Sequence, residues 1–134
     1  MSETYIPAEL RRLVVARARR RCEYCGIREE DTYFGCEVDH IISEKHGGST
    51  DEANLAFACV VCNRAKGSDI ATLAEDGAVV ELFHPRRHAW NDHFSIEGAR
   101  IIGLTRIGRA TERLLKLNAP DRIEERVWIQ RWKS

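Results

Sequence analysis

The sequence predicts an α+β fold for its 134 residues, and three observations lead to this prediction. Short apolar runs bounded by turn residues are typical of strands, and other segments repeat apolar residues at helical spacing. Two C-x-x-C pairs, at 22–25 and 59–62, can fasten elements too small to bury a core of their own. We expect a single domain over residues 1–134. A central unit occupies residues 20–68, a helix precedes it, and an extension at 78–134, with a β-hairpin and two helices, packs on it.

The composition limits the class of protein. The 43% of hydrophobic residues and 31% of charged residues are typical of a soluble globular chain. No apolar run approaches the roughly 20 residues of a membrane helix, and the N-terminus lacks a signal-peptide pattern. We therefore expect a cytoplasmic protein of a bacterium or phage, with no membrane partner and an oligomeric state that the sequence leaves open. In such a reducing compartment, paired C-x-x-C motifs favour metal binding over disulfides.

The net charge of zero conceals an uneven distribution. Residues 1–25 hold six Arg against three Glu, and residues 26–62 hold two bases against eight acids. Residues 63–134 hold thirteen bases against ten acids. An acidic middle between basic flanks fits a site that gathers metal ions while the flanks bind phosphates. Ordinary solvated surfaces explain the same pattern equally well.

The first predicted element is a helix after a frayed N-terminus. Pro7 suits a first helical turn, and the helix should run to about Arg20 or Arg21. Its apolar face comprises Leu10, Leu13, Val14 and Ala18. Four arginines lie largely off that face and are candidates for contact with a nucleic-acid backbone, because a guanidinium pairs well with phosphate; they are Arg11, Arg12, Arg19 and Arg20. A plain solvent-exposed face is the alternative.

The next feature is the first cysteine pair, Cys22 and Cys25, followed by Gly26, which can adopt a positive φ. Together with Cys59 and Cys62 it supplies four sulfurs, the ligand set of a tetrahedral zinc ion. Iron or disulfides are the alternatives. Because protein would fill all four positions, such a metal is structural and has no open site for chemistry. We expect the fifth cysteine, Cys36, to be a buried and inert thiol.

The central stretch reads as strand, loop, strand and helix. A β-type run at Glu37–Ile42 contains adjacent Asp39 and His40, and a polar loop follows at 43–53. Asn54 precedes a second apolar run at Leu55–Val61, and a polar helical segment begins at Cys62 and Asn63.

This stretch resembles the HNH endonucleases, in which the last "H" position is often Asn, as at Asn63. His40 precedes Asn54 by 14 positions, and Asn54 precedes Asn63 by 9, within the frame of the two cysteine pairs. The resemblance covers roughly residues 20–68. It implies a ββα-metal (His-Me finger) core stapled by Zn(Cys)4. It also implies a catalytic Mg²⁺ or Mn²⁺ ion held by Asp39 and Asn63, and double-stranded DNA as the substrate.

The residue chemistry agrees with that resemblance. His40 is a natural general base, because its ordinary pKa near 6.5 leaves much of it neutral at pH 7. Asp39 and the Asn63 side-chain oxygen are hard ligands that suit magnesium. By the resemblance, Asn54 orients the histidine and braces the loop. Neighbours on a flat strand point to opposite faces, so we expect a bulge, a strong twist or the end of the strand at Asp39 and His40.

Further basic residues are candidates for phosphate contact. Lys66 and Arg64 follow Asn63 on the same predicted helix, and Arg86 and Arg87 open a basic, aromatic-bearing segment. That segment either binds nucleic acid or is a hairpin loop with solvated bases; its other notable residues are His84, His88, Trp90 and His93. We do not expect His46 to be a ligand.

The remaining elements are predicted from turn and cap residues. Residues 68–77 should finish the helix and turn at Asp76 and Gly77, before a strand at Ala78–Phe83. A hairpin spans residues 94–104. Thr105 should cap a helix to about Leu117, with Ile107, Ala110, Leu114 and Leu115 facing inward, and Asn118 should cap a last one. That last helix should cover the core with Ile123, Val127, Trp128 and Trp132.

The sequence thus favours a metal-dependent DNA endonuclease that nicks one strand per active site. The alternatives are a non-catalytic, zinc-stapled DNA-binding module and a nuclease directed at RNA.

Overall fold

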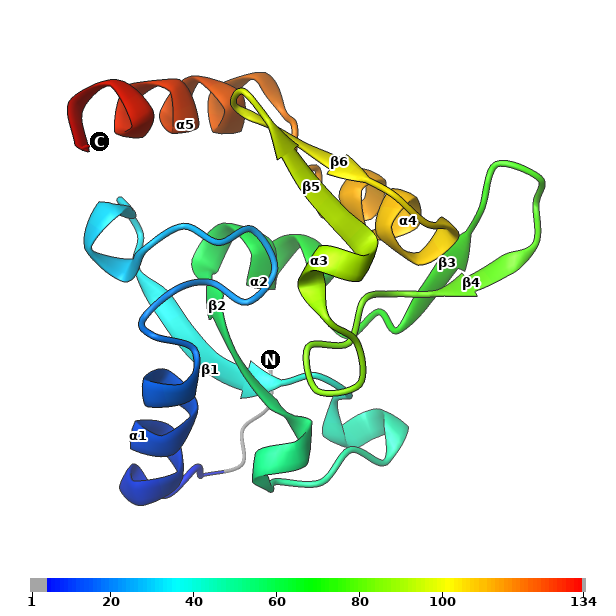
Figure 1. The fold of residues 1–134 in the computed structure, drawn as a ribbon. Coiled ribbons are helices and arrows are strands. Elements are labelled where there is room, and N and C mark those ends of the chain that lie inside the picture. The colour runs from blue at the N-terminus through cyan, green and yellow to red at the C-terminus, as the bar shows by residue number, and fades with distance from the viewer. Residues whose placement is uncertain (1–4, 134) are drawn as a thin grey trace. The chain divides into compact units, whose positions relative to one another are not determined.

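The computed structural model describes residues 5–133, and the chain divides into two compact units (Figure 1). The first unit comprises the chain up to Ile70 together with His84–Arg87, and the second comprises Ala71–Phe83 and the chain from His88. The expected packing of residues 78–134 on the central unit, as one domain, stays a prediction. Among the described helices, none has the length and apolarity needed to cross a lipid bilayer.

The centre of the first unit is a strand–strand–helix arrangement. β1 (Cys36–His40) pairs antiparallel with β2 (Leu55–Cys59), and α2 (Val60–Lys66) follows β2 directly. The connection contains two single turns of 3-10 helix, η2 (Glu44–His46) and η3 (Glu52–Asn54). This mixed α+β arrangement confirms the predicted fold class. β2 ends two residues before its predicted limit, because the Cys59 sulfur accepts the Cys62 N–H and so starts the helix at Val60. β1 also ends two residues early, at His40.

The N-terminal helix packs against this sheet. α1 (Ala8–Arg17) places Val14 in a core cluster with Ile6, Val38, Leu55 and Phe57. Ile6 is buried, so the predicted fraying does not extend to this residue, and residues 1–4 lie outside the described part of the chain.

The helix is also shorter than the sequence predicts, and one residue of its apolar face is misplaced. Arg19 and Arg20 adopt positive φ angles of 54° and 55°, so the chain leaves the helix at Arg17 and turns toward the first cysteine pair. Leu13 was expected to face the core and is instead exposed. One short turn, η1 (Glu29–Asp31), lies between the cysteines and β1.

The second unit begins with a hairpin of which only the second strand is predicted from the sequence. β3 (Ala71–Leu73) pairs with β4 (Val79–Glu81), so residues 68–73 do not continue the preceding helix. The helix ends at Lys66 because Gly67 takes a positive φ of 53°. The turn at Asp76 and Gly77 lies where it was predicted: the Asp76 carboxylate accepts the Ala78 N–H, and Gly77 has a φ of 84°.

A second hairpin and two helices complete this unit. A helical turn, α3 (Trp90–His93), leads into β5 (Phe94–Glu97), which pairs with β6 (Arg100–Gly103), the predicted hairpin. Thr105 is the N-cap of α4 (Arg106–Leu114), as predicted, and its hydroxyl accepts the Gly108 N–H. Ala110 and Leu115 are buried, and Ile107 and Leu114 are partly buried.

The last helix, α5 (Pro120–Lys133), differs from the prediction in two ways. Asn118 does not supply the expected cap, because its side chain is engaged with the backbone N–H and carbonyl of Ile101. The residues of α5 that were expected in the core lie largely outside it. Ile123 is partly buried, whereas Val127, Trp128 and Trp132 are 48%, 63% and 64% exposed.

Candidate active site and four-cysteine centre

The two cysteine pairs meet at one buried point. The sulfurs of Cys22, Cys25, Cys59 and Cys62 all lie within 4.8 Å of one another, and Cys25 and Cys59 are 3.8 Å apart. A tetrahedral zinc ion with Zn–S bonds of about 2.3 Å requires sulfurs separated by roughly 3.8 Å. The donor set and its spacing therefore fit a structural zinc ion, as the sequence predicts.

Backbone donors prepare these sulfurs for a cation. The N–H groups of Tyr24 and Cys25 approach the Cys22 sulfur at 3.4 Å, and that of Cys62 approaches the Cys59 sulfur at the same distance. Hydrogen bonds from the other thiols, that of Cys22 first, lower the pKa of Cys59. Burial raises the pKa of Cys22, and hydrogen bonds from the other thiols raise that of Cys62. A bound cation would therefore be needed to hold all four sulfurs as thiolates, the form that ligates metal.

The knuckle around the first pair is tied to the sheet. Gly26 has a φ of 80° and donates its N–H to the Cys22 carbonyl, which closes the predicted tight turn. Glu23 donates its N–H to the Phe57 carbonyl and accepts the Phe57 N–H through its carboxylate. Cys36 is not a member of the cluster, although it pairs with Cys59 across the two strands. It is a half-buried thiol whose pKa burial raises to about 12, which is consistent with an inert group.

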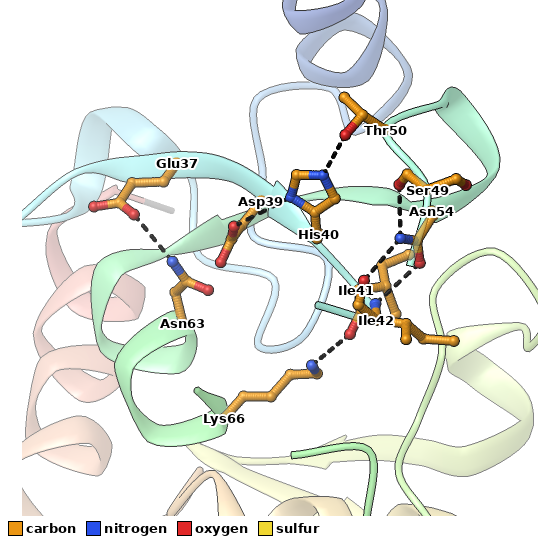
Figure 2. Close-up of polar contacts among 10 residues, drawn as sticks. All are labelled: Glu37, Asp39, His40, Ile41, Ile42, Ser49, Thr50, Asn54, Asn63 and Lys66. Atoms are coloured by element: carbon orange, nitrogen blue, oxygen red, sulfur yellow. Dashed lines mark hydrogen bonds and ion pairs between the residues drawn. The ribbon is translucent and has the colours of Figure 1, made fainter. Parts of the chain in front are cut away.

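Asp39 and His40 lie at the end of β1, one of the three geometries expected for this pair. The Asp39 carboxylate is 3.9 Å from His40 Nδ1, so the two neighbouring side chains converge (Figure 2). The His40 side chain is 1% exposed and that of Asp39 is 18% exposed. The carboxylate is therefore reachable from solvent while the ring is enclosed.

The His40 ring is oriented by a residue that the sequence analysis did not single out. Its Nε2 lies 2.8 Å from the Thr50 hydroxyl in the loop between the strands. Its Nδ1 is buried and has no hydrogen-bond partner among the described residues. If Nε2 donates to Thr50, the Nδ1 lone pair remains available. A buried polar atom without a partner calls for an explanation, and a catalytic role is one.

Asn54 holds the loop closed from the start of β2. Its Oδ1 accepts the Ile42 N–H, and its Nδ2 donates to the carbonyls of Ile42 and Ser49, each at 2.9 Å. These contacts join the end of β1 to the segment that carries Thr50. Gly48 is required beside them, because a Cβ there would lie 1.7 Å from the Ile42 carbonyl oxygen.

Asn63 lies on α2 and faces a second carboxylate on β1. Its Nδ2 donates to Glu37 Oε2 at 3.0 Å, which leaves its Oδ1 free of that contact. Glu37 and Asp39 are two residues apart on one strand, so their side chains share a face (Figure 2). This period of two, together with the acidic residue type, was the signal in the sequence that could have identified Glu37.

Lys66 is not arranged as a surface phosphate contact. The residue is 5% exposed, and its ammonium donates to the Ile41 carbonyl at 2.7 Å. Burial lowers the pKa of Lys66, and the charge of nearby Asp39 opposes this effect. In this position the side chain joins α2 to the end of β1.

The other candidate nucleic-acid contacts fall into two groups. Four have exposed guanidinium groups that make no hydrogen bond or ion pair with another described residue: Arg12, Arg19, Arg64 and Arg87. Three have protein partners: Arg11 donates to the Ile6 carbonyl, Arg20 pairs with Glu29, and Arg86 pairs with Glu23. Burial lowers the pKa of Arg86 to about 10.

The aromatic residues that follow Arg87 are part of the second unit's packing. His88 and His93 lie with their ring centres 5.0 Å apart, and each also contacts the buried Phe83. Trp90 stacks on Phe94 at 5.1 Å. His84 belongs to the first unit, where it is buried and its Nδ1 accepts the Arg86 N–H. His46, not expected to be a ligand, is exposed on η2.

Comparison with known proteins agrees with the motifs. Neither the curated proteins nor the solved structures gave a significant match to the chain. Residues 22–69 match the family model of the HNH endonuclease, and this match confirms the HNH resemblance that the spacing of Asp39, His40, Asn54 and Asn63 predicts.

Proposed function

We propose that the protein is a metal-dependent endonuclease that hydrolyses phosphodiester bonds of double-stranded DNA, cutting one strand per active site. The observation that supports this most directly is the environment of His40. One ring nitrogen is engaged by Thr50, the other is buried without a hydrogen-bond partner among the described residues, and Asp39 lies beside it. This arrangement occurs inside the segment that matches the HNH endonuclease model.

In this proposal His40 is the general base. Its Nδ1 takes a proton from the water that attacks phosphorus, and Thr50 keeps the other ring nitrogen fixed as the donor. The Asp39 carboxylate stabilises the imidazolium that results, because it is 3.9 Å from Nδ1. Asn54 contributes by holding the loop that carries Thr50.

Asp39 and the Oδ1 atom of Asn63 would hold the catalytic cation. They offer two hard oxygen donors, and Mg²⁺ or Mn²⁺ binds in proteins through one or two such groups together with substrate phosphate and water. When bound, the cation supplies positive charge that stabilises the phosphate and the leaving oxygen. The Asn63 N–H group is already satisfied by Glu37, so its oxygen is the atom left to face a ligand.

The four cysteines would hold a separate zinc ion with a structural role. Their sulfurs are fully enclosed and supply four ligands, so no position remains for a substrate. The bound ion would join the segment after α1 to the junction of β2 and α2.

The phosphate backbone of the DNA would contact exposed arginines of the first unit. The primary candidates are Arg12, Arg19, Arg64 and Arg87. Arg11, Arg20 and Arg86 are the secondary candidates because each already has a protein partner. Lys66 is not among the contacts that we propose, since its ammonium is buried against the Ile41 carbonyl.

Cleavage of supercoiled plasmid tests the proposal directly. With Mg²⁺ or Mn²⁺ the wild-type protein should convert supercoiled plasmid to the nicked form, and EDTA should stop the reaction. His40→Ala should lower the rate by about 10²–10⁴-fold, the range of a general base. His46→Ala is the matched control, because this histidine is exposed on η2, in the connection that follows β1, and should be dispensable.

The alternatives give different outcomes. If His40→Ala cleaves as well as the wild type while its fold is intact, the proposed base is wrong. DNA binding without any cleavage would indicate a non-catalytic module held by zinc. A faster reaction on RNA than on plasmid would redirect the activity to RNA.

A further inference from the structure

We propose that Glu37 is a positioning residue that sets the orientation of the Asn63 side-chain amide, so that Oδ1 rather than Nδ2 faces the catalytic cation. The inference rests on the proposed function, because it concerns the same cation site. It assigns a role to a residue outside the Asp39, His40, Asn54 and Asn63 set.

The contact itself is specific. Glu37 Oε2 accepts a hydrogen bond from Asn63 Nδ2 at 3.0 Å, across the interface between β1 and α2 (Figure 2). Both residues are partly buried, so water competes less for the contact than it would on an open surface. The rest of the acidic strand face is supplied by Asp39, two positions further on.

An amide needs this kind of control because its two ends are similar in shape and opposite in chemistry. Rotation by 180° about the last side-chain bond exchanges the oxygen, which can bind a cation, for an NH₂ group, which cannot. An ionised carboxylate only accepts hydrogen bonds, so Glu37 stabilises the rotamer in which Nδ2 points toward it. In that rotamer Oδ1 points away from Glu37 and is available as a ligand.

Partners that orient metal ligands have measurable effects. Loss of such a partner typically lowers metal affinity or activity about 10–100-fold. The competing explanation is that Glu37 is itself a ligand, since one of its two oxygens is not used by Asn63. A positioning residue should matter only when residue 63 is an amide that can be misoriented. A direct ligand should matter whether residue 63 is Asn or Asp.

The first experiment measures Mn²⁺ binding to the zinc-loaded full chain by electron paramagnetic resonance of free Mn²⁺, without DNA. Glu37→Leu should weaken Mn²⁺ binding about 10–100-fold. Glu37→Gln, which keeps an oxygen acceptor, should stay close to the wild type. Glu30→Gln is the control for removal of an acid, because Glu30 is exposed and pairs only weakly with Arg28 at 3.6 Å.

The second experiment repeats Glu37→Leu in a background of Asn63→Asp. Both oxygens of a carboxylate can bind the cation, so orientation no longer matters and Glu37→Leu should cause no further loss of Mn²⁺ affinity. Zinc content should remain that of the parent, and every variant should keep a single cooperative thermal transition. These two readouts separate a positioning effect from loss of the fold.

Several results would overturn the inference. Wild-type Mn²⁺ affinity in Glu37→Leu would show that Asn63 needs no orienting partner. An equal loss in both backgrounds would make Glu37 a direct ligand, and an equal loss in Glu37→Gln would make its charge the cause. A protein that shows the expected dependence on position 63 but cleaves no nucleic acid would contradict the proposed function and leave the role of Glu37 standing.

Discussion

Thr50 holds the enclosed imidazole of His40 in place through one hydrogen bond of 2.8 Å, in which we propose that the Nε2–H of His40 is the donor. Thr50→Val keeps the shape of the side chain but leaves a buried ring N–H without its partner, a loss of about 1–3 kcal/mol. We therefore expect kcat to fall about 10–100-fold, since about 1.4 kcal/mol corresponds to a factor of ten, with KM for plasmid little changed. Steady-state nicking assays measure both parameters.

Thr50→Ser is the matched variant for this prediction, because it retains the hydroxyl and loses only a methyl group. It should keep most of the wild-type kcat. Equal loss in the Ser and Val variants would mean that the methyl group, and so packing of the loop, matters more than the hydrogen bond.

The site residues that could be predicted from the sequence were those of a rare residue type, such as Cys and His, at a spacing that is typical of a metal or nuclease motif. The four cysteines form the expected cluster, and Asp39 and His40 converge at the end of their strand as the chemistry required. Thr50 was missed because Thr is an ordinary surface residue, and Glu37 was missed although its spacing of two from Asp39 places it on the same face of the strand. Their significance depends on distances across a loop and between a strand and a helix, which one sequence does not supply.

At the scale of elements, α1 is attached to the sheet by a charged side chain as well as by its apolar face. Arg17 donates to the carbonyls of Glu52 and Leu55 at 2.6 and 2.7 Å, just where β2 begins. Arg17→Met should lower the free energy of unfolding by about 1–2 kcal/mol, the cost of losing partly exposed charge-assisted hydrogen bonds. Urea denaturation of the zinc-loaded protein measures this change.

Arg12→Met is the control for that measurement, because Arg12 lies on the same helix and its guanidinium has no partner among the described residues. It should leave the unfolding free energy within about 0.5 kcal/mol of the wild type. If Arg12→Met and Arg17→Met destabilise the protein equally, helix propensity rather than the attachment to β2 explains the effect.

The existence of most elements was predictable, and their ends were less so. Thr105 and the second hairpin were recognised because cap and turn residues act locally. The end of α1 and the start of α2 lie beside cysteines: Arg19 and Arg20 take positive φ angles just before Cys22, and the Cys59 sulfur caps α2. The exposed tryptophans of α5 were wrongly assigned to the core. An apolar pattern shows which residues share one face of a helix, but it does not show whether another element packs against that face.

At the scale of the whole molecule, the chain separates into a unit that carries the candidate site and a unit that lies entirely outside the HNH match. The first has a core built around Val14, Val38 and Leu55, and it also carries the cysteine cluster. The second has buried residues of its own, including Phe94, Ile101 and Leu117. Removal of zinc should therefore destabilise the first unit much more than the second.

Removal of zinc tests this division. A structural zinc site contributes on the order of 10 kcal/mol to folding, more than a small unit has in reserve. Chelation, or Cys59→Ser, should therefore abolish slow hydrogen exchange at the amides of Val14 and Leu55. The amides of Ile101 and Leu115 in the second unit should stay protected. Mass spectrometry of exchanged peptides measures both regions at once, and Cys36→Ser is the control because that thiol lies outside the cluster. Persistent protection of Val14 and Leu55 without metal would show that the apolar core alone holds the first unit, whereas loss in both regions would show that the two units fold together.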